Sequence, residues 1–513
     1  MKSYVLSRES AVPVRDRSRM STERGDMMGT AFTRRPVAGP ATGDAAWLLR
    51  LGYRPELRRR LGPVATFALA YSCMSPVITA YALFTSPPGV VLGLPLGWGL
   101  VVAAVGQLLV ALVLGEVVAQ FPLTGGLYAW VRRLWGRRSA WLAAWVYGFA
   151  MLGMIAGLGY GAGPYLATVV GFEPSVDSGV GCAVVLVAVA TAVNLAGTRA
   201  LGVAVTAGLV VEVAGILVVG TWVLLSQRHR DLSVLFDPKS AAVALVVGAG
   251  LFGVFQFSGF EAAGSVAEEV ADPARRVPRA LWLAVVVGGV LSTYVCVVLM
   301  MTAPGPGAHG SGTGPLTQVL YGALGPAGGR AALGIVLLCF LSGIIGLQAA
   351  AGRLLFSAAR DGMLPGSRLL ATVSVARAVP APALVVAGAV PVLLVYISRI
   401  FPGTMAAIGA FAVLGIYLGV QTVVLAALRA RVRGWRPAGG FSLGRWAFPV
   451  NVGALAYGVV ALVCLLWPPL AGSSLPLVAG ALVVSVGLAV LALLRPHRRS
   501  GAIAGDAVRP PAG

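Results

Sequence analysis

Lysine is nearly absent from this sequence of 513 residues, and charged side chains of every kind are scarce. Only Lys2 and Lys239 occur, and neither closes a G-x-x-x-x-G-K-[ST] loop, so the chain lacks this phosphate-binding motif of nucleotide hydrolysis. Asp, Glu, Lys and Arg make up 11% of the residues, about half the share found in soluble globular proteins. This composition excludes a large water-soluble domain.

Histidine and cysteine are also too few and too scattered to build a reactive centre. The three histidines, His229, His309 and His497, fall in polar or Gly/Pro-rich gaps, which argues against a metal centre or a catalytic triad at membrane depth. The five cysteines lie far apart within apolar runs and read as small buried hydrophobic residues. We therefore predict a protein that is not an enzyme and that uses no cofactor or metal.

Apolar residues, in contrast, make up 58% of the chain, and the mean hydropathy is +0.86. A helix that crosses a bilayer needs about 20 apolar residues. Such stretches centre on residues 63–86, 97–120, 141–167, 179–197, 202–226, 243–267, 279–302, 329–357, 382–401, 404–428, 446–468 and 474–494. We predict an all-α integral membrane protein with twelve transmembrane helices, embedded in the lipid bilayer.

The net charge of +21 is explained by membrane topology and does not indicate a nucleic-acid partner. Thirteen of the 39 Lys and Arg residues precede Gly62. We predict that residues 1–56 are a disordered cytoplasmic tail, 57–494 the membrane domain and 495–513 a second cytoplasmic tail. We predict a multi-pass protein of the cytoplasmic membrane with both termini in the cytoplasm. In this orientation, the gaps between stretches that lie on the outer side of the membrane hold few basic residues. These are Arg228, Arg230, Lys239, Arg330 and Arg399.

The gap between the second and third stretches, residues 121–138, mixes apolar and aromatic residues with arginines at helical spacing. This pattern predicts a short amphipathic helix on the inner membrane surface. A packed cytoplasmic linker is the alternative.

Two of the twelve stretches contain helix breakers, which a membrane tolerates only where the freed backbone faces protein or a water-filled site. Ser72, Ser75 and Pro76 interrupt the first stretch, and glycines surround Phe255–Glu261 in the sixth. Breaks at matching places indicate a transport site at the middle of the membrane, between two repeats of five helices. The predicted repeats span about 63–226 and 243–428, and helices 11 and 12 follow at 446–494. The broken ends would offer N–H groups to a carboxylate and carbonyls to an ammonium group, although Gly and Pro also occur in membrane helices simply to allow close packing.

Three motifs resemble those of the amino acid/polyamine/organocation permeases. They are Gly115–Trp130 with Phe-Pro-x-x-Gly-Gly-x-Tyr-x-Trp, Ser258–Ala280 with Glu-Glu-x-x-x-Pro-x-Arg-x-x-Pro-Arg-Ala, and Arg360–Pro365 with Arg-Asp-Gly-Met-Leu-Pro. The resemblance covers Leu57 to Leu494 and implies the five-plus-five inverted repeat of the leucine-transporter type, with discontinuous helices 1 and 6. The chain departs from many relatives in helix 1, where Ser75-Pro76 stands in place of glycines.

Residues around the two breaks are the predicted substrate contacts. They are Ser72, Ser75, Thr79, Phe255, Ser258 and Gly259. The resemblance implies that the Phe255 ring closes over the substrate, whereas most phenylalanines are simply packed. Ser and Thr in membrane helices also often bond their own carbonyls four residues back.

Five acidic residues are expected to serve coupling or gating. Glu261 and Glu212 lie deep in apolar runs, where a carboxylate is costly unless it faces water, a partner or a proton path. We predict that both couple transport to protons; the alternative is that each is a structural carboxyl group. Glu268, Glu269 and Asp361 lie among arginines and are predicted to form inner-gate ion pairs, with ordinary solvated charge as the alternative.

The sequence thus predicts a secondary transporter that moves amino acids by alternating access, coupled to protons as a symporter. The small-molecule substrate could instead be another organic amine, such as choline, ethanolamine, GABA or a polyamine, and the carrier could be an exchanger. A channel or a membrane sensor is a more distant alternative, because no ring of charges or repeated filter is evident.

Overall fold

The structure is a computed structural model, and it describes residues 43–84, 95–173, 175–228, 253–302, 315–401, 403–466 and 474–508. Within these ranges every regular element is a helix, apart from an isolated bridge between Leu61 and Val270, and loops connect the helices. Among the described residues, ten helices are long and apolar enough to cross a membrane, and Leu477–Leu493 is a shorter apolar helix. The all-helical membrane architecture is therefore confirmed, while the count of twelve spans stays a prediction, since residues 243–252 of the sixth stretch lie outside the described ranges.

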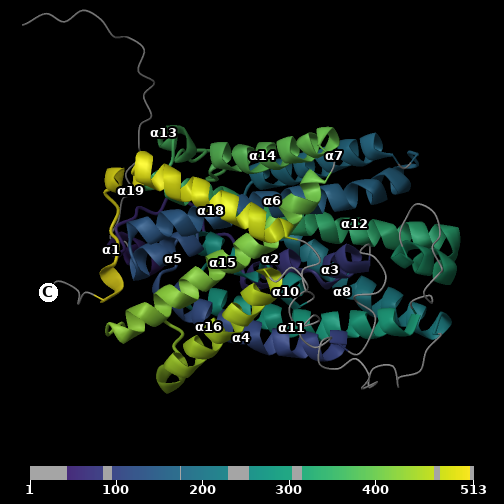
Figure 1. Cartoon of the computed structure of the whole chain (residues 1–513), viewed down its shortest axis with the longest axis horizontal. Coiled ribbons are helices and arrows are strands. Elements are labelled where there is room, and N and C mark those ends of the chain that lie inside the picture. Colours follow the sequence, from purple (N-terminus) through teal and green to yellow (C-terminus); the bar gives the residue numbers. More distant parts are fainter. Residues whose placement is uncertain are drawn as a thin grey trace, which may run out of the picture. The chain divides into compact units, whose positions relative to one another are not determined.

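The helices run side by side as a bundle in the unit Gly43–Gly513 (Figure 1). The helix α11 packs along α4, α15 along α6, and α12 along both α6 and α8. The membrane-length elements are α2 (Pro63–Met74) with α3 (Pro76–Phe84), α4 (Pro95–Gln120), α6 (Arg137–Val170), α7 (Val176–Ala196), α8 (Thr198–Ser226), α11 (Pro273–Thr302), α12 (Pro315–Arg360), α14 (Ala381–Ile400), α15 (Thr404–Val432) and α16 (Ala447–Leu466). The shorter ones are α1 (Asp44–Arg50), α5 (Leu127–Leu134), α10 (Gly253–Gln256), η4 (Phe260–Glu269), α13 (Ser367–Leu370), η5 (Gly444–Trp446), α18 (Leu475–Leu493), α19 (Pro496–Arg499) and η6 (Asp506–Val508).

The first span is interrupted where its sequence contains proline. The helix α2 ends at Met74, Ser75 adopts φ −19° and ψ 118°, and α3 begins at Pro76. Proline has no N–H to continue the ladder, and its ring clashes with the carbonyl four residues earlier. The predicted break in the first stretch is therefore present.

The second break lies between α10 and η4. Gly259 has φ +104°, a backbone conformation that favours glycine, and the following ten residues form a 3₁₀ helix with a kink at Val266. The tighter 3₁₀ winding has poorer hydrogen-bond geometry than an α-helix, and a stretch this long often marks a functional hinge. The sixth stretch is thus interrupted where its glycines predicted.

The segment predicted to be a surface helix forms α5, but all eight of its residues are buried, including Arg132 and Arg133. It packs against α6 and α15, and the Trp130 indole donates a hydrogen bond to the carbonyl of Phe121 at 3.0 Å. A Cβ atom on Gly264 would come within 2.3 Å of the Trp130 ring, so a glycine in η4 makes room for it. The alternative of a packed linker describes this segment better than a helix on the membrane surface.

The predicted N-terminal tail reached residue 56, and its first 42 residues lie outside the described ranges. The remainder differs from that prediction, because Asp44–Arg50 forms α1 with Leu48 only 2% exposed. Leu48 joins the main hydrophobic core and Trp47 packs against it, which offsets the entropy lost on ordering the segment.

Candidate functional site

The two helix breaks meet in the middle of the bundle, where Figure 1 shows α2, α3 and α10 close to one another. The Gln256 side chain donates a hydrogen bond through Nε2 to the carbonyl of Met74 at 3.0 Å. A Cβ atom on Gly259 would stand 2.6 Å from the carbonyl oxygen of Cys73, so only glycine allows this approach. The carbonyl end of α2 is thus held directly against the second break.

Glu212 of α8 reaches the first break. Its side chain is buried, with a residue exposure of 1%, and Oε1 accepts hydrogen bonds from the Ser75 hydroxyl at 2.5 Å and the Val77 amide at 3.2 Å. The first turn of α3 has unpaired amides and a partial positive charge, both of which favour a carboxylate. Glu212 therefore caps the half-helix that begins at the break.

Glu261 of η4 occupies the matching place at the second break. It is 3% exposed, and its two oxygens accept hydrogen bonds from the Tyr147 hydroxyl at 3.1 Å and the Gly259 amide at 3.1 Å. The structure therefore places both predicted coupling carboxylates at the breaks. Tyr147 of α6 was not predicted.

The predicted substrate contacts surround the same breaks, but most of their hydroxyls already have protein partners. Ser72 accepts a hydrogen bond from Ser342 at 2.9 Å, Thr79 donates to the carbonyl of Ser75 at 3.3 Å, and Ser258 donates to the carbonyl of Val254 at 2.5 Å. Phe255 is half-buried and packs against the apolar cluster of α15 and α16. Its role as a lid stays a prediction.

A small cavity of about 10 Å³ lies beside Glu261 and is lined by side chains from α4, η4 and α15. Its polar members are Gln107, Ser258, Glu261, Tyr417 and Gln421. Gln107 donates a hydrogen bond to the Tyr417 hydroxyl, which lies 3.4 Å from that of Tyr457. Gln107, Tyr417 and Gln421 were missed in the sequence, although the amide side chains of Gln107 and Gln421 inside apolar runs were a signal that could have found them.

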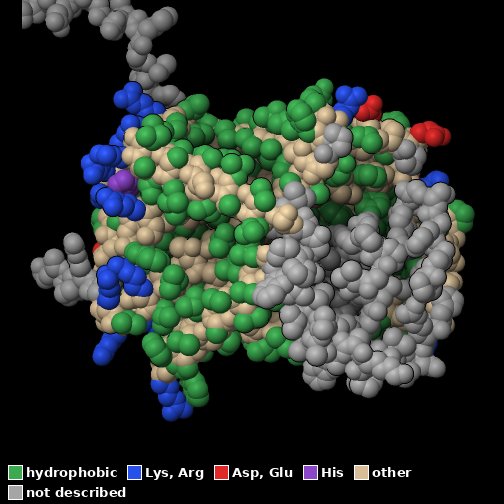
Figure 2. Space-filling view, viewed as in Figure 1, with side chains coloured by type: hydrophobic (Ala, Val, Ile, Leu, Met, Phe, Trp, Pro, Cys, Tyr) green, Lys and Arg blue, Asp and Glu red, His purple; other side chains and the backbone are tan. Residues whose placement is uncertain are grey.

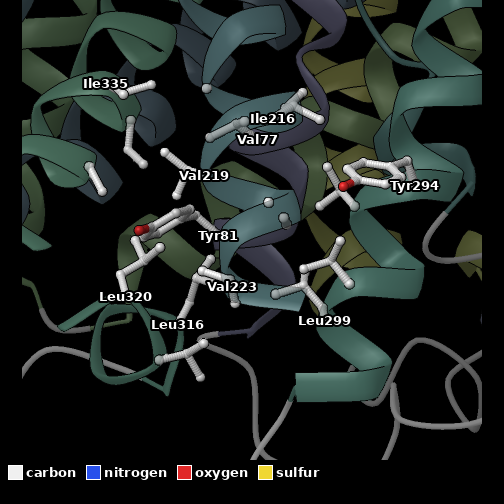
Figure 3. Close-up of a pocket in the computed structure, with 18 residues that line it drawn as sticks. Val77, Tyr81, Ile216, Val219, Val223, Tyr294, Leu299, Leu316, Leu320 and Ile335 are labelled. Atoms are coloured by element: carbon white, nitrogen blue, oxygen red, sulfur yellow. The ribbon is translucent and has the colours of Figure 1, made fainter. Parts of the chain in front are cut away.

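A second, larger cavity of about 100 Å³ lies among α3, α8, α11 and α12, and its lining is almost wholly apolar (Figure 3). It begins next to the first break, because Val77 both lines it and donates its amide to Glu212. The side chains labelled in Figure 3 are Val77, Tyr81, Ile216, Val219, Val223, Tyr294, Leu299, Leu316, Leu320 and Ile335.

Basic side chains gather at the end of the bundle that holds α19 (Figure 2), which we call the arginine-rich end. The three acids predicted to lie at an inner gate are found here, each in an ion pair. Glu269 binds Arg353 at 2.8 Å, Glu268 binds Arg360 at 2.9 Å, and Asp361 binds Arg132. Because the exposures of these acids are 0%, 2% and 7%, they are not the solvated charges of the alternative interpretation.

Two tyrosines complete the pairing of Asp361. Tyr53 and Tyr128 donate hydrogen bonds to its two carboxylate oxygens at 2.8 and 2.7 Å. Burial raises the pKa of Tyr53 to about 12, so this phenol remains a hydrogen-bond donor at neutral pH. The Arg360 guanidinium also stacks 4.0 Å from the centre of the Tyr53 ring. The arginine-rich end is therefore closed by a buried network that joins the segment after α1 to α5 and α12.

Glu116, near the same end of α4, ties further segments together. It pairs with Arg431 of α15 and accepts a hydrogen bond from the Leu443 amide at 3.1 Å. Arg431 in turn donates to Asn451 of α16 at 3.1 Å. This cluster joins α4 to α15, to α16 and to the segment that precedes α16.

Residues 500–508, which we call the C-terminal strap, fold back over α5 and the start of α6. Arg137 donates two hydrogen bonds to the Ala502 carbonyl at 2.9 and 2.7 Å, and the Gly505 amide donates to the Arg132 carbonyl at 2.9 Å. Asp506 pairs with Arg133, whose guanidinium also donates to the carbonyl of Leu51. The strap thus holds residues 502–506 against the arginines of α5 and of the first turn of α6.

Replacing Asp506 with Asn should loosen this strap. Arg133 is 1% exposed and would lose its anionic partner, so we expect a cost of about 1–2 kcal/mol and a fall of a few degrees in the thermal-unfolding midpoint of purified protein. Asp177→Asn is the control, because its pair with Arg399 is exposed and should contribute nothing measurable. Equal midpoints for Asp506→Asn and the unmodified protein would contradict the role given to the strap.

The bundle of apolar helices and the buried polar site at two facing breaks define an integral membrane transport protein. Residues 61–488 match the amino acid permease family, and the chain belongs to that family.

Curated relatives agree with this assignment. An uncharacterized amino-acid permease of Schizosaccharomyces pombe is 24% identical over 455 residues, which cover 83% of this chain and 81% of the relative. An uncharacterized transporter of Mycobacterium bovis is 30% identical over 354 residues, covering 65% and 73% of the two chains. An amino-acid permease homolog of Oryza sativa subsp. japonica is 36% identical over 113 residues, covering 22% and 21%.

Proposed function

We propose that this permease is a secondary transporter that carries amino acids through the cytoplasmic membrane by alternating access, with proton symport. The observation that carries the proposal is the meeting of two interrupted helices, with Gly259 against the carbonyl of Cys73 and a buried carboxyl group at each break. An amino acid brings one group of each charge. Broken helix ends of this kind bind a carboxylate through backbone amides and an ammonium group through backbone carbonyls.

Proton coupling is supported by a contrast among the buried acids. Glu116, Glu268, Glu269 and Asp361 each pair with an arginine. Glu212 and Glu261 form no ion pair with any residue that the structure describes, and their hydrogen bonds come from neutral groups instead. A buried carboxylate without a cation is costly in a membrane protein, and binding a proton removes its charge. We therefore assign proton uptake and release to Glu212 and Glu261.

Alternating access requires a gate on each side of the site, and the arginine-rich end supplies one. Three buried ion pairs close it by joining η4 and α12 to each other and to α5. We assign this end to the cytoplasm because arginine-rich loops favour that side. The twelve spans, the five-plus-five inverted repeat and the cytoplasmic location of both termini belong to the same proposal.

The apolar cavity of Figure 3 begins at Val77, beside the first break, and offers room for an apolar side chain. This cavity favours amino acids with aliphatic or aromatic side chains over small polar ones. The acidic side chain of Glu261 at the second break also suits a cationic substrate, which leaves choline, ethanolamine, GABA and polyamines as alternative substrates. Exchange is the alternative mode.

Reconstituted vesicles test the proposal. A labelled amino acid should enter in a saturable way, accumulate when the outside is made more acidic, and exchange with internal unlabelled substrate in counterflow. Flux that rises without saturation would indicate a channel. Saturable counterflow that ignores the proton gradient would indicate an exchanger.

A further inference from the structure

The small cavity beside Glu261 contains a side chain whose hydrogen-bonding groups are buried without partners. Gln421 of α15 is 6% exposed, and neither its Nε2 nor its Oε1 finds a hydrogen-bond partner within the described part of the chain. Each buried polar group left unpaired costs about 1–3 kcal/mol. A native protein therefore tends to supply such an amide with a partner, in many cases an ordered water molecule.

The backbone of α16 holds this amide at the cavity. A Cβ atom on Gly458 would lie 1.9 Å from Cδ of Gln421, so the side chain rests directly against the glycine. The other amide at the cavity, that of Gln107, donates to the Tyr417 hydroxyl. Gln421 is thus the side chain at this cavity with a free donor and a free acceptor.

The size of the cavity selects the ligand. About 10 Å³ is close to the smallest space that holds one water molecule, and a water needs two to four polar partners. Gln421 offers an N–H and a carbonyl, the Glu261 carboxyl group lines the same space, and the Ser258 oxygen can still accept a hydrogen bond. No amino acid fits in this volume.

We propose that this cavity binds a single water molecule between the Gln421 amide and the Glu261 carboxyl group, and that this water delivers the proton to Glu261. The bound water takes up a proton that enters from the aqueous phase, gives one proton to a Glu261 oxygen, and remains as neutral water. The reverse step returns the proton to the water and leaves the carboxylate. This inference rests on the proposed proton coupling and adds the route by which the proton arrives.

Infrared difference spectroscopy after a pH step, on purified protein in lipid, tests the inference. The unmodified protein should show a carboxyl band and a water O–H band, and the water band should shift when H₂¹⁸O replaces H₂¹⁶O. Gln421→Leu should lose the water band and reduce proton-driven uptake about tenfold, while counterflow persists. Gln348→Leu is the control, because its amide bonds Thr191 at 2.6 Å and does not line the cavity.

The outcomes separate this inference from the proposed function. Because Glu212 also takes up a proton in this proposal, Glu261→Gln should weaken the carboxyl band without abolishing it. A carboxyl band of unchanged intensity in Glu261→Gln would remove the proton-coupling role of Glu261. A weakened carboxyl band in Glu261→Gln would keep that role, and the bound water alone would then be overturned by the absence of an isotope-sensitive water band in the unmodified protein or by an unchanged water band in Gln421→Leu. The isotope measurement on the unmodified protein needs no variant, so it decides the question even if Gln421→Leu fails to fold.

Discussion

Arg353→Met should destabilise the protein by about 3–5 kcal/mol, because it leaves the carboxylate of Glu269 buried without a cation. Both side chains have an exposure of 0%, and Arg353 donates to both oxygens of Glu269, at 2.8 and 3.1 Å. The pair joins α12 to the end of η4, so its loss should also weaken the closed arginine-rich end. The thermal-unfolding midpoint of purified protein measures the change.

The double variant Arg353→Met/Glu269→Gln is the matched control. It removes the orphaned charge and should recover most of the lost stability, because replacing a whole buried pair is often close to neutral. The Thr198 hydroxyl, which donates to Glu269 at 2.5 Å, can still bond the glutamine. If the double variant is no more stable than Arg353→Met alone, the cost does not come from an unpaired charge.

Glu261→Gln should remove the pH dependence of uptake while leaving counterflow exchange detectable. The unmodified transporter is expected to take up substrate faster as the outside becomes more acidic, since protons then enter with the substrate. Glutamine keeps the size of the side chain, its oxygen can accept from the Gly259 amide, and its NH₂ group can donate to the Tyr147 hydroxyl, but it cannot bind a proton. Uptake by reconstituted vesicles across a pH series measures the effect.

Tyr147→Phe provides the comparison for this variant. It removes one hydrogen bond from Glu261 but keeps the carboxyl group, so the pH profile should move along the pH axis without becoming flat. A Glu261→Gln protein whose uptake responds to pH as the unmodified protein does would rule out Glu261 as the coupling group.

The sequence was sufficient for the features that depend on local chemistry. Pro76 has no amide hydrogen wherever it occurs, and Gly259 permits a positive φ, so both breaks could be placed before any coordinates. The depth of Glu212 and Glu261 in apolar runs likewise marked them as unusual. The structure adds that Glu212 caps the half-helix at the first break and that Glu261 lies at the second break.

Partners from distant parts of the chain could not be predicted in the same way. Tyr147 lies 114 residues from Glu261, and Arg353 lies 84 residues from Glu269, so packing of whole helices decides which of many arginines and tyrosines they meet. The burial of α5 was missed for the same reason. Its arginines favoured a membrane surface, but Arg132 and Arg133 pair with carboxylates just after α12 and in the C-terminal strap.

The central claim is that one substrate site lies where the two breaks meet, and Cys73 reports on it directly. This native thiol lies at the end of α2 beside Gly259, whereas the other four cysteines are outside the breaks and can be changed to alanine. In that variant a transported amino acid should slow alkylation of Cys73, with half-maximal protection near its KM for uptake. If a saturating concentration of every transported substrate leaves the alkylation rate of Cys73 unchanged, the site does not lie between the breaks.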